Sequence, residues 1–208
     1  YIINNSKIHV IPRGVDINYF YPLKKKLINK NIFIPSRISS WKGHDLLLKY
    51  FSLLDQKYKE LFNIHLISLN KSKDEKKIQS LINKLNISNK IIIHKPTLEI
   101  NKLYQEAYLV VNISRRPEGF GRTISEALSS SKTIIAPNQG GTKEQLFNFD
   151  KKLLFDVNSF KSFQKTFKYA LKNYQSISKK GRSYIKKHYS SDIMCQKTLE
   201  VYKGLINL

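Results

Sequence analysis

Two glutamates that stand eight positions apart, Glu118 and Glu126, are the residues of this chain best placed to do chemistry. The apolar run at residues 108–113 precedes them and predicts a buried parallel strand, and the pattern after Gly121 predicts a short helix. In open α/β sheets, ligands bind at such strand-to-helix turns. Glycines let the backbone approach a diphosphate, N–H groups at a helix start bind its oxygens, and carboxylates accept hydrogen bonds from sugar hydroxyls. The segment therefore indicates a site for a nucleotide sugar.

Two basic residues are expected at the same edge of the sheet. Arg37 and Lys42 follow the first predicted strand, at residues 32–35, and Gly43 comes directly after them. A transferase that uses a nucleotide sugar must stabilise the negative charge that grows on the departing diphosphate, and cationic side chains with a helix start can do this. Arginine offers a planar fork and lysine a compact charge. We therefore predict that Arg37 and Lys42 bind the diphosphate.

Strands alternate with helices along the chain, which positions these residues. The predicted strands are residues 32–35, 64–69, 90–94, 108–113, 133–136 and 153–156, and the predicted helices are residues 46–54, 74–85, 98–107 and the segment from the glycine turn to about residue 130. Residues 158–206 are predicted to be helical almost throughout, with breaks near Gly181 and near Ser190. The alternation predicts an α/β fold with a Rossmann-like, doubly wound parallel sheet and a helical C-terminal tail.

We divide the chain into three parts. Residues 1–30 form an irregular inter-domain segment that contains Pro12 and Gly14 and ends in a lysine run at 24–26. Residues 31–157 form the nucleotide-sugar-binding core, and residues 158–208 are the C-terminal helices of the same domain. A chain of 208 residues can bury one full core. Because the chain begins with Tyr1, we expect it to be part of a longer protein.

The chain is strongly basic, with 37 Lys and Arg against 15 Asp and Glu and a net charge of +22. Such a charge raises nucleic acid or an anionic membrane as partners. The lysines are scattered along helices and do not form one arm, which favours a solvated surface. Contact with anionic lipid stays open, and the lysine-rich C-terminal third is the expected contributor. A basic α/β nucleic-acid-binding domain is the alternative, but it leaves the Glu118 segment unexplained, so we expect no nucleic acid partner.

The cysteine count and the hydropathy pattern bound the cellular setting. Cys195 is the only cysteine, so an intrachain disulfide and a cysteine-based metal site are excluded within these residues. This composition fits a reducing cytoplasm. The sequence contains no apolar run of the roughly 18 residues needed to span a bilayer. We therefore expect a cytoplasmic location and, where the membrane is contacted at all, a peripheral contact with its inner face.

Four segments together resemble the retaining, GT-B-type glycosyltransferases, specifically the bacterial group 1, or family 4-like, members. The stretch from Arg116 to Thr123 with Glu126 is similar to their E-(seven residues)-E signature. The other three are residues 11–16 with Phe20, residues 35–37 with 41–43, and residues 137–144, which resemble, in order, the start of the family's second domain, its diphosphate-binding Arg and Lys, and its glycine-rich turn. The resemblance covers only the second, donor-binding half of a GT-B fold. It implies that the N-terminal, acceptor-binding domain is missing from this chain.

The resemblance also implies a role for each candidate residue. Glu126 would accept hydrogen bonds from the ribose hydroxyls, and Glu118 would contact the transferred sugar, while Arg37 and Lys42 hold the diphosphate without a metal ion. The residues expected to line the sugar-diphosphate pocket are Gly119, Phe120, Gly121, Arg122 and Thr123, and those expected beside the base are His94 and Lys95. No resident cofactor and no metal ligand are expected. The donor would be a sugar of UDP or GDP.

The function implied by the resemblance is that of a retaining, hexosyl-type glycosyltransferase in bacterial cell-envelope glycan synthesis. It would move a sugar from a nucleoside-diphosphate sugar to a glycan or lipid-linked acceptor. A nucleotide-sugar epimerase and a phosphorylase share the fold and remain alternatives. The first needs extra acid and base groups that face the sugar, and the second needs a lysine suited to a pyridoxal cofactor, and no motif for either is visible.

Overall fold

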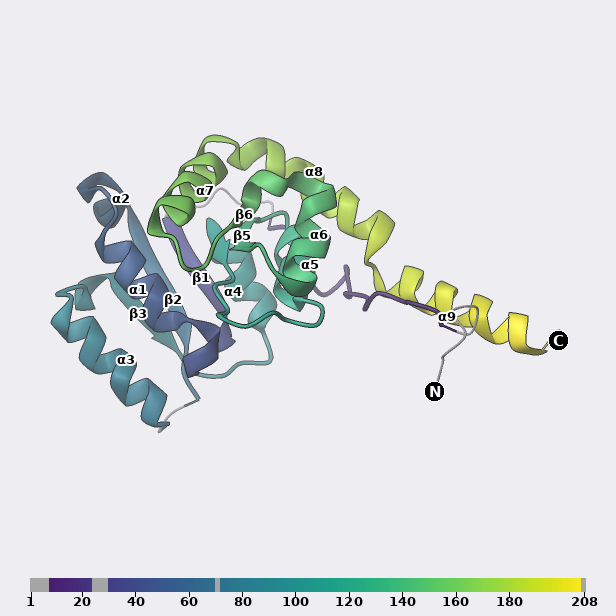
Figure 1. The fold of residues 1–208 in the computed structure, drawn as a ribbon, viewed down its shortest axis with the longest axis horizontal. Coiled ribbons are helices and arrows are strands. Elements are labelled where there is room, and N and C mark those ends of the chain that lie inside the picture. Colours follow the sequence, from purple (N-terminus) through teal and green to yellow (C-terminus); the bar gives the residue numbers. More distant parts are fainter. Residues whose placement is uncertain (1–7, 24–29, 70–71, 207–208) are drawn as a thin grey trace.

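The computed structural model describes residues 8–23, 30–69 and 72–206, and these residues contain a six-stranded parallel sheet in the order β3-β2-β1-β4-β5-β6 (Figure 1). The strands are β1 Lys30–Arg37, β2 Phe62–Ile67, β3 Ile91–His94, β4 Leu109–Val111, β5 Thr133–Pro137 and β6 Leu154–Phe155. The predicted Rossmann-like sheet is therefore confirmed. The strand order reverses between β1 and β4, which makes this pair the topological switch point. Lys42 follows β1 and Glu118 follows β4.

Helices connect and cover the strands. They are α1 His44–Ser52, α2 Gln56–Leu61, α3 Lys73–Lys84, α4 Ile100–Glu106, α5 Arg122–Ser129, α6 Gly140–Asp150, α7 Phe160–Lys172, α8 Tyr174–His188 and α9 Ser191–Ile206, with 3-10 turns η2 Ser40–Lys42, η3 Ser88–Lys90 and η4 Lys151–Leu153. Parallel strands joined by right-handed crossovers place α1 and α3 on one face of the sheet and α5 and α6 on the other. Figure 1 shows α1 and α3 side by side.

The central strands are buried on both faces, as expected of a parallel sheet covered by helices. All residues of β4 and β5 are buried, which explains why these strands read as continuous apolar runs with no alternation. Tyr104 of α4 is fully buried and packs edge to face against Phe33 and Phe20. This aromatic cluster fixes α4 against β1 and against the N-terminal segment, just below the carboxyl ends of the strands.

The C-terminal helices differ from the prediction at one break. The break near Ser190 is confirmed, but the break predicted at Gly181 is wrong, because α8 runs through Gly181 and the chain interrupts its helices at Asn173 instead. A Cβ at position 181 would lie 2.9 Å from Cδ2 of Leu128 in α5. The glycine therefore serves close helix packing, which overrides its low helix propensity. Sequence analysis also missed α2.

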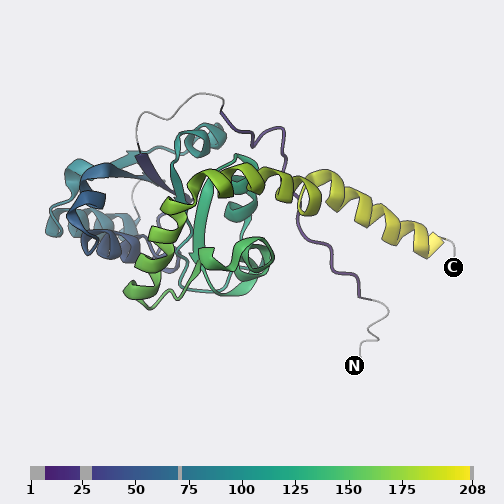
Figure 2. The ribbon, with the colours of Figure 1, turned by 90° about the horizontal axis from the view of Figure 1, so that it is seen from above.

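The N-terminal segment is held against the C-terminal helices. Val15 forms a parallel bridge with Ser190, and Arg182 of α8 donates from Nη1 to the Phe20 carbonyl at 2.9 Å and from Nη2 to the Ile17 carbonyl at 3.0 Å. The lysine run at 24–26 lies outside the described residues. α9 projects away from the body of the domain (Figures 1 and 2). No helix in the part of the chain that the structure describes has the length and apolarity needed to cross a membrane.

The loop after β4 approaches the start of α6 unusually closely. A Cβ added to Gly141 would lie 2.4 Å from the carbonyl oxygen of Phe120, and the Gly141 N–H donates to the Glu118 carbonyl at 2.8 Å. Gly119 is the opposite case, because a Cβ there would meet no atom within 4 Å. The loop that carries Glu118 is therefore positioned by backbone contact with α6.

We expect Gly141→Ala to lower the free energy of unfolding by about 2–3 kcal/mol, because packing an extra carbon against fixed backbone costs ~1–3 kcal/mol. Gly119→Ala is the matched control and should change the stability by less than about 0.5 kcal/mol, as surface substitutions do. Urea unfolding followed by circular dichroism measures both. A Gly141→Ala variant as stable as Gly119→Ala would contradict the close approach.

Candidate active site

A hollow of about 830 Å³ lies at the carboxyl ends of β1 and β4, and we call it the switch-point hollow. The predicted residues that line it are Lys42, Glu118, Gly119, Phe120, Gly121, Arg122, Thr123 and Glu126. Residues of the N-terminal segment, including Arg13 and Tyr19, also line it. The structure thus brings both signature glutamates and Lys42, one of the two residues predicted to bind the diphosphate, around a common space.

Lys42 and Glu118 form a direct ion pair across the two loops. Nζ of Lys42 lies 2.7 Å from Oε1 of Glu118, and only 17% and 11% of the two side chains are exposed. The same carboxylate oxygen accepts hydrogen bonds from Nδ2 of Asn112, at 3.3 Å, and from the hydroxyl of Ser114. Donors from β1's loop and from the end of β4 therefore converge on one carboxylate.

These contacts set the protonation of Glu118. Burial raises the pKa of its carboxyl, but hydrogen bonds from Lys42, Ser114 and Asn112, together with the charge of Lys42, outweigh burial and leave the pKa below its ordinary value. Glu118 is therefore ionised at neutral pH. An ionised carboxylate is an acceptor-only group, which suits it to bind hydroxyls or to stabilise a developing positive charge.

Glu126 lies on the second turn of α5 and is also buried, with 8% exposure. Its Oε2 accepts a hydrogen bond from the hydroxyl of Tyr104 at 2.6 Å, and its Oε1 pairs with Nη2 of Arg122 at 3.1 Å. The side chain of Arg122 is 62% exposed, so this pair is open to solvent on one side. Tyr104 orients one oxygen of Glu126 and leaves the other toward the hollow.

The loop that carries Lys42 is held by its neighbours. Gly43 has a φ of 74°, in the left-handed region that favours glycine, and a Cβ there would lie 2.1 Å from the Ile113 carbonyl oxygen. The Nε2–H of His44 donates to the Ser36 carbonyl at 3.1 Å, and burial lowers the pKa of His44 to about 4, so its ring is neutral. Nζ of Lys42 also lies 4.0 Å from the centre of the Trp41 ring. Lys42 is thus positioned and is not a freely moving surface lysine.

Three predicted site residues do not line the switch-point hollow. Arg37 ends β1 with an exposed side chain, and Lys95 is exposed beyond β3. Nε2 of His94 lies 2.9 Å from Nδ1 of His65, and burial together with the charge of His94 lowers the pKa of His65 to about 4. Their roles toward a ligand stay predictions. Arg13, which sequence analysis did not select as a site residue, also lines the hollow.

Sequence analysis also missed the residues that hold the two glutamates. Tyr104 has the pattern of a core aromatic residue, and its contact with Glu126 depends on the packing of α4 against α5. Asn112 carried a usable signal, because it is a polar residue inside an apolar strand. Nδ2 of Asn112 donates to Oγ1 of Thr123 at 2.9 Å as well as to Glu118, so one side chain joins β4 to the start of α5.

The arrangement can bind a polyhydroxylated anion. Two buried carboxylates offer acceptors to hydroxyls, Lys42 and Arg122 offer positive charge, and the start of α5 adds N–H groups that lack intrahelical partners. Among the described residues, no group of three or more His, Cys, Asp and Glu side chains is placed to hold a metal ion. The cationic side chains and the start of α5 can stabilise negative charge that develops on a bound ligand.

Comparison with known proteins adds to this geometry. Residues 19–189 match the family described as Glycosyl transferases group 1. A glycosyltransferase of Haemophilus influenzae is 25% identical over 185 residues, which cover 87% of this chain and 50% of that protein. The crystal structure of a glycosyltransferase from Rickettsia africae has a TM-score of 0.87 and 27% identity, covering 98% of this chain and 59% of that one. The chain therefore spans about half the length of these relatives.

Another solved structure has the same fold at a lower sequence identity. HepE of Anabaena, whose structure was solved in complex with UDP and glucose, has a TM-score of 0.81 and 19% identity, covering 96% of this chain and 57% of that chain. At this level of identity the likeness shows a shared fold. The doubly wound sheet and the C-terminal helices are thus shared with both solved structures.

Replacing Lys42 by Met should raise the pKa of Glu118, because burial would then act with two hydrogen bonds but without the ammonium charge. A carboxyl ¹³C NMR titration measures this, and Lys76→Met, which removes a charge from exposed α3, is the control. The wild-type pKa lies below the ordinary value of 4.5, so the pair stabilises the fold fully above that pH and loses its effect as pH falls through the lowered pKa. The stability gap between wild type and Lys42→Met should accordingly shrink in acid. An unchanged pKa in Lys42→Met would contradict the ion pair.

Proposed function

Because this chain belongs to the group 1 glycosyl transferases, we propose that it is the donor-binding half of a retaining enzyme that transfers a hexose from a nucleoside-diphosphate sugar to a glycan or lipid-linked acceptor. The observation that carries the proposal is the meeting of Lys42, Glu118 and Glu126 around one hollow at the switch point. The epimerase, phosphorylase and nucleic-acid alternatives have no comparable observation in their favour.

In this proposal each pre-existing ion pair exchanges a partner when the donor binds. The ammonium group of Lys42, which pairs with Glu118 in this structure, also contacts the diphosphate. There it stabilises the negative charge of the leaving group as the bond to the sugar breaks. Glu118 accepts hydrogen bonds from the transferred sugar and lies where positive charge develops at the anomeric carbon. Oε1 of Glu126 accepts hydrogen bonds from the ribose hydroxyls. This requires the Arg122 guanidinium to leave Oε1 and to move toward the phosphates. Arg37, at the end of β1, is assigned the far side of the diphosphate.

The proposed donor is a UDP sugar, with a GDP sugar as the second choice. The support for UDP is the Anabaena relative, which was solved with UDP and glucose. We place the base near Ile100 and Tyr19, the part of the hollow closest to the α4 side of the sheet. His94 and Lys95, at the end of β3, would contact the base through backbone atoms. No metal ion is required in this scheme, since lysine, arginine and the α5 start supply the positive charge.

We propose that the reacting end of the acceptor binds to a second domain. The chain covers 50% of its Haemophilus relative and 59% of the Rickettsia chain. α9 projects from the domain and exposes Leu199, Tyr202 and Leu205 at 56%, 58% and 64%. We propose that this face packs against the acceptor domain of the whole protein. For the whole protein we propose a cytoplasmic location and bacterial cell-envelope glycan synthesis, with the lysines of α7 and α8 near anionic lipid at the inner membrane face.

Glu126→Gln should weaken UDP binding about tenfold or more, because hydrogen bonds to charged groups contribute ~1.5–3 kcal/mol. The glutamine keeps one oxygen to accept the hydrogen bond from the Tyr104 hydroxyl. Its NH₂ group replaces the oxygen that would accept hydrogen bonds from the ribose hydroxyls. Inorganic pyrophosphate, which has no ribose, should bind equally to both proteins. Isothermal titration calorimetry measures the binding of each ligand, and Glu144→Gln, at an exposed position of α6, is the charge-matched control. Equal UDP affinity in Glu126→Gln would exclude the ribose role.

Lys42→Met should weaken UDP more than UMP, by about tenfold against less than about threefold, because the ammonium contacts the phosphate that UMP lacks. The same calorimetry applies, with Lys76→Met as the control. Arg37→Met should also weaken UDP more than UMP, because we assign Arg37 to the far side of the diphosphate. A uniform loss of UDP and UMP in Lys42→Met would show that the lysine supports the fold of the site and does not bind the second phosphate.

A further inference from the structure

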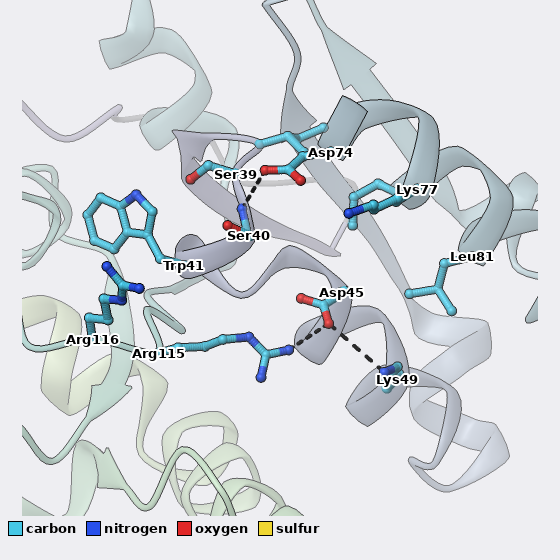
Figure 3. Close-up of a pocket in the computed structure, with 12 residues that line it drawn as sticks. Ser39, Ser40, Trp41, Asp45, Lys49, Asp74, Lys77, Leu81, Arg115 and Arg116 are labelled. Carbon is cyan, nitrogen blue, oxygen red and sulfur yellow. Dashed lines mark hydrogen bonds and ion pairs between the residues drawn. The ribbon is translucent and has the colours of Figure 1, made fainter. Parts of the chain in front are cut away.

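A second hollow, of about 590 Å³, lies on the other side of Trp41 between α1, α3 and the loop after β4 (Figure 3). We call it the α1–α3 hollow. Trp41 lines both this space and the switch-point hollow. Its size is within the range of small-molecule sites, about 300–1,000 Å³. The two spaces are therefore neighbours that share one aromatic wall.

The surfaces of the α1–α3 hollow are of two kinds. Its apolar lining consists of Ile38 from the end of β1 and Ile78 and Leu81 from α3, with the indole of Trp41 at one end. Ser39 and Ser40 of the β1–α1 loop line the same space. A flat apolar floor beside hydroxyls and charges suits a ring that has one apolar face and a polar edge, as a pyranose has.

The charges around the hollow are unequally satisfied. Asp45 is engaged by Nη2 of Arg115 at 2.6 Å and by Nζ of Lys49 at 4.0 Å, and Asp74 accepts the Ser40 N–H at 2.8 Å (Figure 3). Both acids are therefore bound to the protein itself.

Two cations of the hollow remain without such partners. Within residues 8–23, 30–69 and 72–206, no carboxylate lies within ion-pair distance of Arg116 or Lys77. In Figure 3 they stand at opposite ends of the space, Arg116 beside Trp41 and Lys77 on α3. The unsatisfied charge facing this hollow is thus positive at both ends.

We propose that the α1–α3 hollow binds a sugar unit that carries a negative charge, a carboxylate or a phosphate, and that this unit is a non-reacting part of the acceptor. The ring lies on the apolar floor and against Trp41, and its anionic group pairs with Arg116 or Lys77. Arginine binds carboxylate and phosphate through two parallel N–H groups, which suits either anion. The assignment to the acceptor rests on the proposed function, because only the shared Trp41 wall places this sugar next to the transfer site.

Trp41 is the only tryptophan of the chain, so its fluorescence reports on the wall that the two hollows share. Substitutions of Arg116 and Lys77, which line only the α1–α3 hollow, assign the response to that space. The probes are the acidic sugars glucose 6-phosphate and glucuronate. Glucose is the control for a sugar without charge, and inorganic phosphate is the control for an anion without a sugar. We expect a saturable change in Trp41 emission with both acidic sugars and at least about tenfold weaker responses to glucose and phosphate. At least one of the variants Arg116→Ala and Lys77→Ala, the one that removes the cation paired with the anionic group, should bind the acidic sugars about three- to tenfold more weakly than the wild type. Lys76→Ala, at an exposed position of α3 next to Lys77, should leave the affinity for the acidic sugars unchanged.

Three results would overturn the proposal. These are no saturable response to either acidic sugar, a response to inorganic phosphate as strong as that to glucose 6-phosphate, or equal affinity in Arg116→Ala, Lys77→Ala and the wild type. UDP binding, measured separately by calorimetry, distinguishes this proposal from the proposed function. UDP should bind the Arg116→Ala and Lys77→Ala variants as it binds the wild type, so its binding survives a failure at the α1–α3 hollow. A failure of the donor assignment would instead appear as absent UDP binding in every variant.

Discussion

Burying an ionised carboxylate at the meeting of β1 and β4 is the constraint on which the rest of the site depends. An unpaired charge in such a place is strongly destabilising, so Glu118 requires donors from every side. Lys42 comes from the loop after β1, Asn112 from the end of β4 and Ser114 from the loop beyond. These segments meet only where the strand order reverses. The protonation state of Glu118 is therefore a property of the sheet topology.

The same constraint explains what could be predicted from the sequence. Lys42 and Glu118 follow the ends of β1 and β4 within one short loop each, and Glu126 lies on α5, the helix that follows β4, so placing β1, β4 and α5 also places them. Tyr104 and Arg13 reach the hollow from distant segments, and their contacts depend on how α4 and the N-terminal segment pack, which local patterns do not encode. At Gly181 the sequence predicted a helix break that the structure does not contain. A glycine inside a helical pattern is compatible either with a break or with a close helix contact. The contact with Leu128 of α5, which is distant in sequence, shows that the second explanation applies.

Both signature glutamates are paired with other side chains of this chain. Glu118 pairs with Lys42, and Glu126 with Arg122 and Tyr104. A ligand that binds here must replace these contacts, so its affinity is the difference between two sets of charge-assisted hydrogen bonds. The contacts with Lys42, Ser114 and Asn112 keep Glu118 ionised. The arrangement also favours ligands that bring both negative charge for the cations and hydroxyls for the acids, because a ligand with only one of these leaves half of a broken pair unsatisfied.

The N-terminal segment couples this site to the C-terminal helices. Tyr19 and Phe20 line the hollow, while Arg182 of α8 holds the carbonyls of Ile17 and Phe20. Five residues before Phe20, Val15 pairs with Ser190, at the point where α8 gives way to α9. A change in the direction of α9 would therefore act on the strand bridge at Val15, and through it on the wall that carries Arg13 and Tyr19. Any domain that packs on α9 would have a short and continuous route to the geometry of the hollow.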